Sequence, residues 1–187
     1  MFSRLLITFL VGVLTTTFAF ADEAKVARSF PLPQMGRLEL TIPSEWKDQV
    51  RQPPQGLPPT ITLTPAVGNS CQVLITPLWA VGPGVVVPGR EEIRKLVQGA
   101  ADQAKPQAVE ETIPLRELVG SFGSGYYFTA TDKAPGPGEF KYMTQGAVRA
   151  GEIALMFTVL TNDGAESALS SSLEMLKSAR HLPPDAP

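Results

Sequence analysis

The segment 152–160 constrains the fold of this chain more than any other, because it is apolar on both sides. Successive side chains of a strand point to opposite faces. One face of this segment carries Ile153, Leu155, Phe157 and Val159, and the other carries Ala154, Met156 and Leu160, interrupted by Thr158. A strand with two apolar faces is covered on both sides. The sequence therefore predicts a strand in the middle of a sheet.

Six further segments have the pattern of strands. They are residues 38–42, 60–64, 71–79, 112–119, 126–132 and 140–149, most of which are rich in alternating or β-branched residues. Pro114 places the segment 112–119 at a sheet edge or beside a bulge. Short turns join most of the segments, and Ala150 and Gly151 form one before the segment 152–160, where glycine supplies a positive φ. We predict a mainly antiparallel sheet of about six to seven strands.

Two segments have the pattern of amphipathic helices. Apolar side chains recur at helical spacing over residues 90–105 and again over residues 165–180. Asp163 is the expected cap of the second helix, with Glu166 as its reciprocal partner. Helices that pack on a central sheet give an α+β fold, and we predict an α/β/α sandwich.

The N-terminal residues have the pattern of a signal peptide. Arg4 precedes an apolar run over residues 5–20, and Ala19 and Ala21 form a small-residue cleavage site. The run is shorter than the roughly 20 residues of a membrane-spanning helix, although an uncleaved anchor is the alternative. We predict cleavage after Ala21 and a periplasmic or secreted protein. The predicted organisation is a signal peptide over 1–21, a flexible lead over 22–35, one α+β domain over 36–182 and a proline-rich tail over 183–187.

Charge and residue types limit the functions of this chain. The net charge is −2 and no run of like charges occurs, which argues against nucleic acid as a partner. Cys71 is the single cysteine and His181 the single histidine. Nucleophilic catalysis and zinc sites normally need more of these residues. We therefore predict no catalytic residue, no metal site and no cofactor, with His181 at the surface.

Cys71 has two interpretations. It opens an alternating strand with Val73 and Ile75 on its face, which favours a buried thiol. A reactive or intermolecularly paired thiol is the alternative.

A few residues are candidates for contact with a partner or ligand. Val85, Val86 and Val87 lie between glycines and prolines in the loop 81–89, where they are either exposed as a contact patch or packed under the next helix. Trp79 ends the strand just before this loop. Tyr127 and Arg149 offer an aromatic ring and a cation on neighbouring strands, although a core and rim position is the alternative.

Three stretches of the chain carry a resemblance to a known family. Residues 38–46 have the sequence L-E-L-T-I-P-S-E-W, and residues 149–152 and 176–180 have R-A-G-E and L-K-S-A-R around a hairpin and a terminal helix. In these features the chain resembles the Mog1/PsbP-like superfamily, and within it the bacterial periplasmic DcrB and PsbP types. The resemblance implies a small, non-catalytic accessory or binding domain. Metal sites of the photosynthetic branch use histidine and carboxylates, and this role does not carry over to a chain with only His181.

The sequence thus predicts an exported accessory domain that binds an envelope protein or a small ligand without chemistry. One alternative is an envelope hydrolase with two carboxylates that face each other across a groove. The pairs Glu91–Glu92 and Glu110–Glu111 are adjacent acids, but sequence neighbours of this kind usually point into solvent. Another alternative is a structural or chaperone-like envelope protein.

Overall fold

The structure is a computed structural model, and it describes residues 24–54, 57–80 and 86–184. Its strands are β1 (Lys25–Leu32), β2 (Gly36–Pro43), β3 (Lys47–Arg51), β4 (Thr60–Thr64), β5 (Cys71–Leu78), β6 (Arg116–Val119), β7 (Ser124–Thr131), β8 (Tyr142–Ala150), β9 (Ile153–Thr161) and β10 (Arg180–Leu182). Its helices are α1 (Arg90–Ala104), the short 3-10 helix η1 (Lys105–Gln107) and α2 (Glu166–Lys177). None of these helices is long and apolar enough to cross a membrane. The predicted signal peptide lies outside the described residues.

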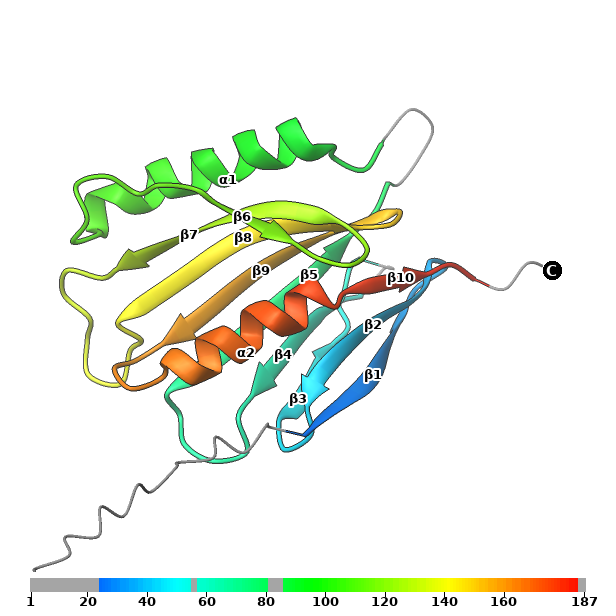
Figure 1. Cartoon of the computed structure of the whole chain (residues 1–187), viewed down its shortest axis with the longest axis horizontal. Helices are drawn as coiled ribbons and strands as arrows, with labels where there is room; N and C mark the ends of the chain where they lie inside the picture. The colour runs from blue at the N-terminus through cyan, green and yellow to red at the C-terminus, as the bar shows by residue number, and fades with distance from the viewer. Residues whose placement is uncertain (1–23, 55–56, 81–85, 185–187) are drawn as a thin grey trace, which may run out of the picture.

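The described strands form two antiparallel sheets. Seven strands follow the order β3-β4-β5-β9-β8-β7-β6, and three follow the order β1-β2-β10. β9 is the fourth of the seven and pairs with β5 and β8 on its two sides (Figure 1). The predicted α+β fold, antiparallel sheet and central position of the segment 152–160 are confirmed.

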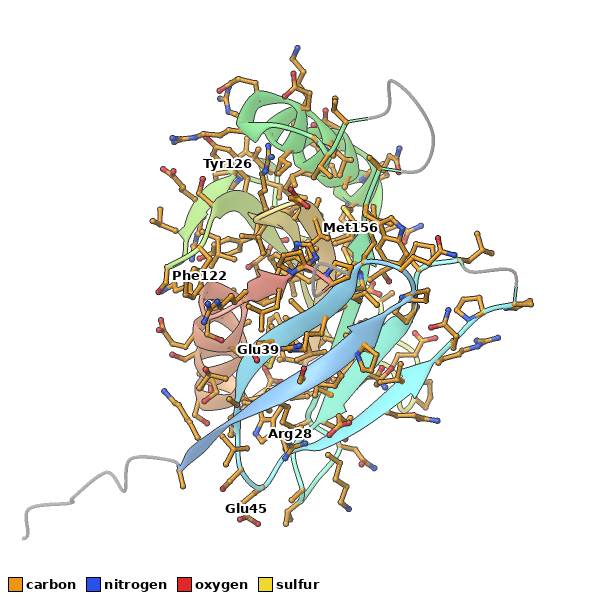
Figure 2. All side chains as sticks on the ribbon, turned by 90° about the vertical axis from the view of Figure 1, so that its right-hand side faces the viewer. Arg28, Glu39, Glu45, Phe122, Tyr126 and Met156 are labelled. Atoms are coloured by element: carbon orange, nitrogen blue, oxygen red, sulfur yellow. The ribbon has the colours of Figure 1, made fainter. Side chains whose placement is uncertain are left out.

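Different elements cover the two faces of the seven-stranded sheet. On one face, α2 and the three-stranded sheet enclose the larger core, to which Leu38, Ile75 and Leu155 belong. On the other face, α1 encloses a smaller core with Ile93 and Phe128. Figure 2 shows Met156 below α1, and this side chain packs against the smaller core. The helices thus lie on opposite faces of the sheet, as predicted, and a small sheet that was not predicted shares one outer layer with α2.

β1 lies where the sequence analysis predicted a flexible lead, so that prediction is wrong over Lys25–Leu32. Phe30 and Leu32 are buried, and the strand pairs with β2 along its length. Pro31 argues against a strand in the sequence, but proline is tolerated in β1 because β1 is an edge strand. The folded region thus begins before residue 36.

The final helix is shorter than predicted. α2 ends at Lys177, and Arg180–Leu182 forms β10, which pairs with the free edge of β2. The basic residues at the end of this segment fit a helix C-terminus, but they do not exclude a strand. The edge of β2 offers backbone hydrogen bonds to the chain after α2, and pairing there ends the helix.

β3 was missed because every residue of Lys47–Arg51 is exposed and the segment has no apolar alternation. The strand exists through its pairing with β4 at the edge of the seven-stranded sheet. Its charged side chains suit such an edge, because they discourage further strands from adding to it. Arg28 of β1 forms an ion pair with Asp48 of β3 at 2.5 Å, which links the two sheets.

Candidate functional site

A pocket of about 550 Å³ lies at the end of the sheet where β8 turns into β9. Its lining residues are Met35, Ala80, Val86, Val87, Gly89, Arg149 and Glu152, and we call it the Arg149 pocket. They come from the β1–β2 turn, the ends of the β5–α1 connection and the β8–β9 turn. Figure 1 shows these connections together at the right-hand end of the molecule. Segments far apart in the sequence thus meet at one site.

The β8–β9 turn sets the position of the two charged side chains. Ala150 pairs with Ile153, so Gly151 and Glu152 form a two-residue turn. Gly151 has a φ of 60°, the positive value that the sequence analysis expected of this glycine. Arg149 donates a hydrogen bond from Nε to the Gly151 carbonyl oxygen at 2.9 Å, which holds the guanidinium over the turn.

Both charges of the pocket are available to a ligand. The terminal nitrogens of Arg149 and the carboxylate of Glu152 make no hydrogen bond or ion pair with the described residues. Both side chains are exposed. A guanidinium presents a planar pair of donors that matches a carboxylate or phosphate. The pocket therefore offers one anion-binding and one cation-binding group beside apolar walls.

His181 contacts two of the turns that form the pocket, which the sequence analysis did not predict. Its Nε2 donates a hydrogen bond to the Met35 carbonyl oxygen at 2.7 Å. The ring also lies next to the turn, because a Cβ on Gly151 would be 3.4 Å from the His181 Cβ. His181 is half-buried rather than a surface residue. The sequence gave no signal of this role, because it depends on β10.

The predicted contact residues divide into two groups. Val86, Val87 and Arg149 line the pocket together, with Val86 81% exposed and Val87 half-buried. Trp79 and Tyr127 instead pack against the larger core. Val85 lies outside the described residues. Nothing in the sequence pointed to Met35 or Glu152 as parts of the same site.

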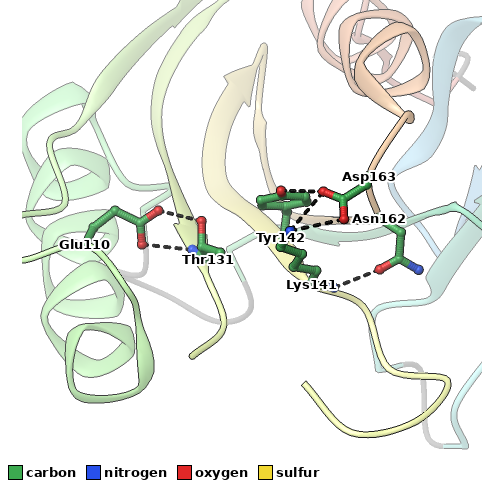
Figure 3. Close-up of polar contacts among 6 residues, drawn as sticks. All are labelled: Glu110, Thr131, Lys141, Tyr142, Asn162 and Asp163. Atoms are coloured by element: carbon green, nitrogen blue, oxygen red, sulfur yellow. Dashed lines mark hydrogen bonds and ion pairs between the residues drawn. The ribbon is translucent and has the colours of Figure 1, made fainter. Parts of the chain in front are cut away.

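Glu110 lies at the end of the sheet opposite to the Arg149 pocket, and Figure 3 shows its contacts with Thr131. Its carboxylate accepts hydrogen bonds from the Thr131 backbone N–H at 2.9 Å and from the Thr131 hydroxyl at 2.6 Å. Burial acts to raise the pKa of Glu110, but the hydrogen bonds from Thr131 outweigh it and lower the pKa. These bonds fix the segment after η1 to β7, so the carboxylate has a structural role.

Asp163 links the β9–α2 connection to the start of β8 and does not cap α2, so the predicted cap is wrong. The N-cap residue is Ala165, with no side-chain cap. The Asp163 carboxylate accepts hydrogen bonds from the Tyr142 hydroxyl at 2.6 Å and from Lys141 Nζ at 3.0 Å (Figure 3). The hydrogen bond from Tyr142, and then that from Lys141, lower the pKa of Asp163. The carboxylate is thus engaged by two charge-assisted hydrogen bonds away from the start of α2.

Cys71 is buried, as the strand pattern predicted. Burial raises the pKa of its thiol, and a hydrogen bond with Ser172 opposes this rise. A thiol with a raised pKa is a poor nucleophile at neutral pH. Over residues 24–54, 57–80 and 86–184, no group of three or more His, Cys, Asp and Glu side chains lies close enough to hold a metal ion.

Comparison with known proteins gives a likeness in fold. No protein-family model matches the chain, and no curated protein sequence matches it. Among solved structures, the chain is similar to the solution structure of cyanobacterial PsbP (CyanoP) from Synechocystis sp. PCC 6803. The TM-score is 0.48 at 8% sequence identity, and the match covers 91% of this chain and 100% of that chain. The similarity is one of fold alone.

Proposed function

We propose that this chain is an exported, non-catalytic accessory domain that binds an envelope protein or a small ligand at the Arg149 pocket. The observation that carries the proposal is the combination, in one cavity, of apolar walls with two opposite charges that have no partner among the described residues. The predicted signal peptide supports export, and with it a place in the periplasm.

The dimensions and chemistry of the pocket fit a binding role. Ligand sites typically have volumes of about 300–1,000 Å³, with apolar walls and a few polar groups that orient the ligand. Val86, Val87 and Met35 supply apolar surface, and Arg149 supplies donors for a carboxylate or phosphate. The hydrogen bond between His181 and Met35 holds one wall in place without a ligand, which lowers the entropic cost of binding.

Capture from bacterial envelope extract tests this proposal. The wild-type protein is compared with Arg149→Ala and with the double variant Val86→Ser/Val87→Ser, and bound proteins and small molecules are identified by mass spectrometry. Arg116→Ala is the matched control, because Arg116 is exposed on β6. We expect at least one species to bind to the wild type and the control and to be lost with both pocket variants. Equal capture by all four proteins would overturn the assignment of this pocket.

A further inference from the structure

The face of the seven-stranded sheet that carries α1 is only partly covered. α1 packs against β7 and β8, which form one side of this face. On β4 and β5 and over most of β9, the side chains that point to the larger core are buried, whereas most of those that point to the α1 face are half-buried. Within the described part of the chain, the surface over these strands and β3 therefore lies open beside α1, except at its Leu160 end, where Phe140 lines one cavity with Leu160 and another with Gln72 and Lys47.

The open surface mixes apolar and hydroxyl side chains at its centre. Gln49, Thr62, Leu74 and Thr158 lie opposite one another on β3, β4, β5 and β9 and form one row across it. Leu160 lies two residues beyond Thr158 on the same face. The threonine methyl groups and the leucines can contact apolar side chains of a partner, while the hydroxyl groups keep the surface from forming a large apolar patch.

α1 forms a wall along this floor. Ala104 and Leu160 line one cavity of about 200 Å³ between the helix and the sheet. Leu96 and Ala100 lie eight and four residues before Ala104, so all three share one flank of the helix. Leu96 is 41% exposed, and the two alanines allow a close approach. The flank and the open floor together form a groove, which we call the α1 groove.

The dimensions of the groove suit a helix. Neighbouring strands lie about 4.8 Å apart, so the four open strands span about 19 Å. A helix with its side chains is about 10–12 Å wide. One helix that lies beside α1 therefore covers β9 and β5, and β4 and β3 remain as its outer rim.

The charge of the rim selects the kind of helix. Lys47 and Arg51 of β3 point to the same face as the groove, because their neighbour Asp48 points to the opposite face and pairs with Arg28. Neither cation makes an ion pair or side-chain hydrogen bond with the described residues. On β3, β4, β5 and β9, no position that faces the groove is Asp or Glu. The rim is thus purely cationic beside a floor of neutral side chains.

We propose that the α1 groove binds an amphipathic α-helix of a partner protein, whose apolar stripe contacts Leu96, Leu74 and Leu160 and whose acidic flank faces Lys47 and Arg51. This is the helix-in-groove mode of recognition, with anchors at i, i+3, i+4 and i+7. Opposite charges at the rim fix the orientation of the helix and speed its association. The proposal does not depend on the function of the Arg149 pocket.

Selection from a library of random 16-residue peptides tests the proposal. The probe is the library itself, displayed on phage and selected on the purified protein. We expect the enriched peptides to share an apolar stripe at helical spacing with acidic residues beside it. Leu96→Glu should lower their affinity at least about tenfold, because it places a charge in the apolar contact. Val119→Glu is the matched control, since Val119 is an exposed apolar residue on β6.

Charge reversal gives an independent readout. The acidic peptides should bind the double variant Lys47→Glu/Arg51→Glu about tenfold more weakly than they bind the wild type. Peptides in which lysine replaces the acidic residues should bind the double variant more tightly than they bind the wild type. Both positions are exposed, so the fold should tolerate the changes. Three outcomes would overturn the proposal. The selection could enrich no peptide, it could enrich peptides without the acidic amphipathic pattern, or the enriched peptides could bind the Leu96→Glu variant as tightly as the wild type. A dimer that Leu96→Glu dissociates, seen by sedimentation equilibrium without peptide, would show that a second copy is the occupant.

Discussion

The coverage of β9 on its two faces can be measured by single truncations. Leu155 is 0% exposed and points to the larger core, whereas Met156 is half-buried and points to α1. Truncation of a buried leucine to alanine costs about 2–5 kcal/mol. Because Leu155 lies in the middle of the central strand, we expect Leu155→Ala to lower the free energy of unfolding by about 3–4 kcal/mol. For the half-buried Met156, we expect Met156→Ala to cost about 1–2 kcal/mol.

Urea denaturation followed by tryptophan fluorescence and by circular dichroism measures these losses. With an m value of about 2 kcal/mol/M, the midpoint should fall by about 1.5–2 M for Leu155→Ala and by about 0.5–1 M for Met156→Ala. Leu78→Ala is the control, because Leu78 lies on neighbouring β5 and is 36% exposed. It should cost less than about 1 kcal/mol. A loss for Leu155→Ala no larger than that for Leu78→Ala would refute the central, covered position of β9.

Three further predictions concern single positions. Gly146→Ala should destabilise the protein by about 2 kcal/mol or more in thermal denaturation, because its Cβ would collide with the Tyr126 carbonyl oxygen and the Phe157 ring. Gly99 lies on α1 with no atom near its Cβ position, so Gly99→Ala should stabilise the protein by about 0.5–1 kcal/mol. A Gly146→Ala protein more stable than the Gly99→Ala protein would contradict the packing. Since the pKa of Glu110 is lowered from 4.5, its contribution to stability is present above pH 4.5 and is lost as the pH falls through the lower, folded pKa. The stability difference between the wild type and Glu110→Gln should therefore shrink below pH 4.5, and a constant difference would count against the Thr131 contact. The Cys71 thiol should react with a thiol reagent only after unfolding, and fast labelling of the folded protein would show that it is not buried.

The elements with strong periodicity could be predicted from the sequence. The two apolar faces of segment 152–160 placed β9 at the centre of the sheet, and the spacing of apolar residues placed α1 within one residue of its observed end. Gly151 was expected to take a positive φ, and it does. In each case the signal is local, because side-chain alternation and turn chemistry depend on neighbouring residues alone.

The elements that depend on distant partners could not be predicted. β3 and β10 are strands only because β4 and β2 offer them an edge, and neither has an apolar pattern of its own. Asp163 fits an N-cap by sequence, but its carboxylate instead accepts hydrogen bonds from Lys141, just before β8, and from Tyr142, the first residue of β8. Local propensity describes what a segment prefers alone, and tertiary contacts can override it.

The candidate site shows the same division. The valines before α1 and Arg149 stood out as unusual residues, but their meeting in one pocket required the path of β5 and β8. Met35, Glu152 and His181 are ordinary in the sequence, and they join the site through the β1–β2 turn, the β8–β9 turn and β10. A sequence can therefore suggest which residues are free for binding, while the sheet decides which of them lie together.

The Arg149 pocket and the α1 groove lie along the same helix, which permits a single ligand to occupy both. Gly89, just before α1, lines the pocket, and Ala104, at the far end of α1, lines the cavity of the groove. α1 has 15 residues and is therefore about 22 Å long. A partner helix of similar length that lies along α1 would place one of its ends near Arg149. That end should be the C-terminus, because its partial negative charge and terminal carboxylate suit a guanidinium.

A double-mutant cycle distinguishes one shared ligand from two separate ones. If a peptide spans both sites, the affinity losses from Arg149→Ala and Leu96→Glu arise in one complex, and an amidated C-terminus should remove most of the effect of Arg149→Ala. If the sites are separate, Arg149→Ala should leave the affinity of groove-binding peptides unchanged within about twofold, because distant sites without shared contacts behave independently. Isothermal titration calorimetry of the free-acid and amidated forms of one peptide on the two variants measures both outcomes. Equal affinities of the free-acid and amidated forms for the wild type would exclude the C-terminal contact with Arg149 and leave the two sites as independent surfaces.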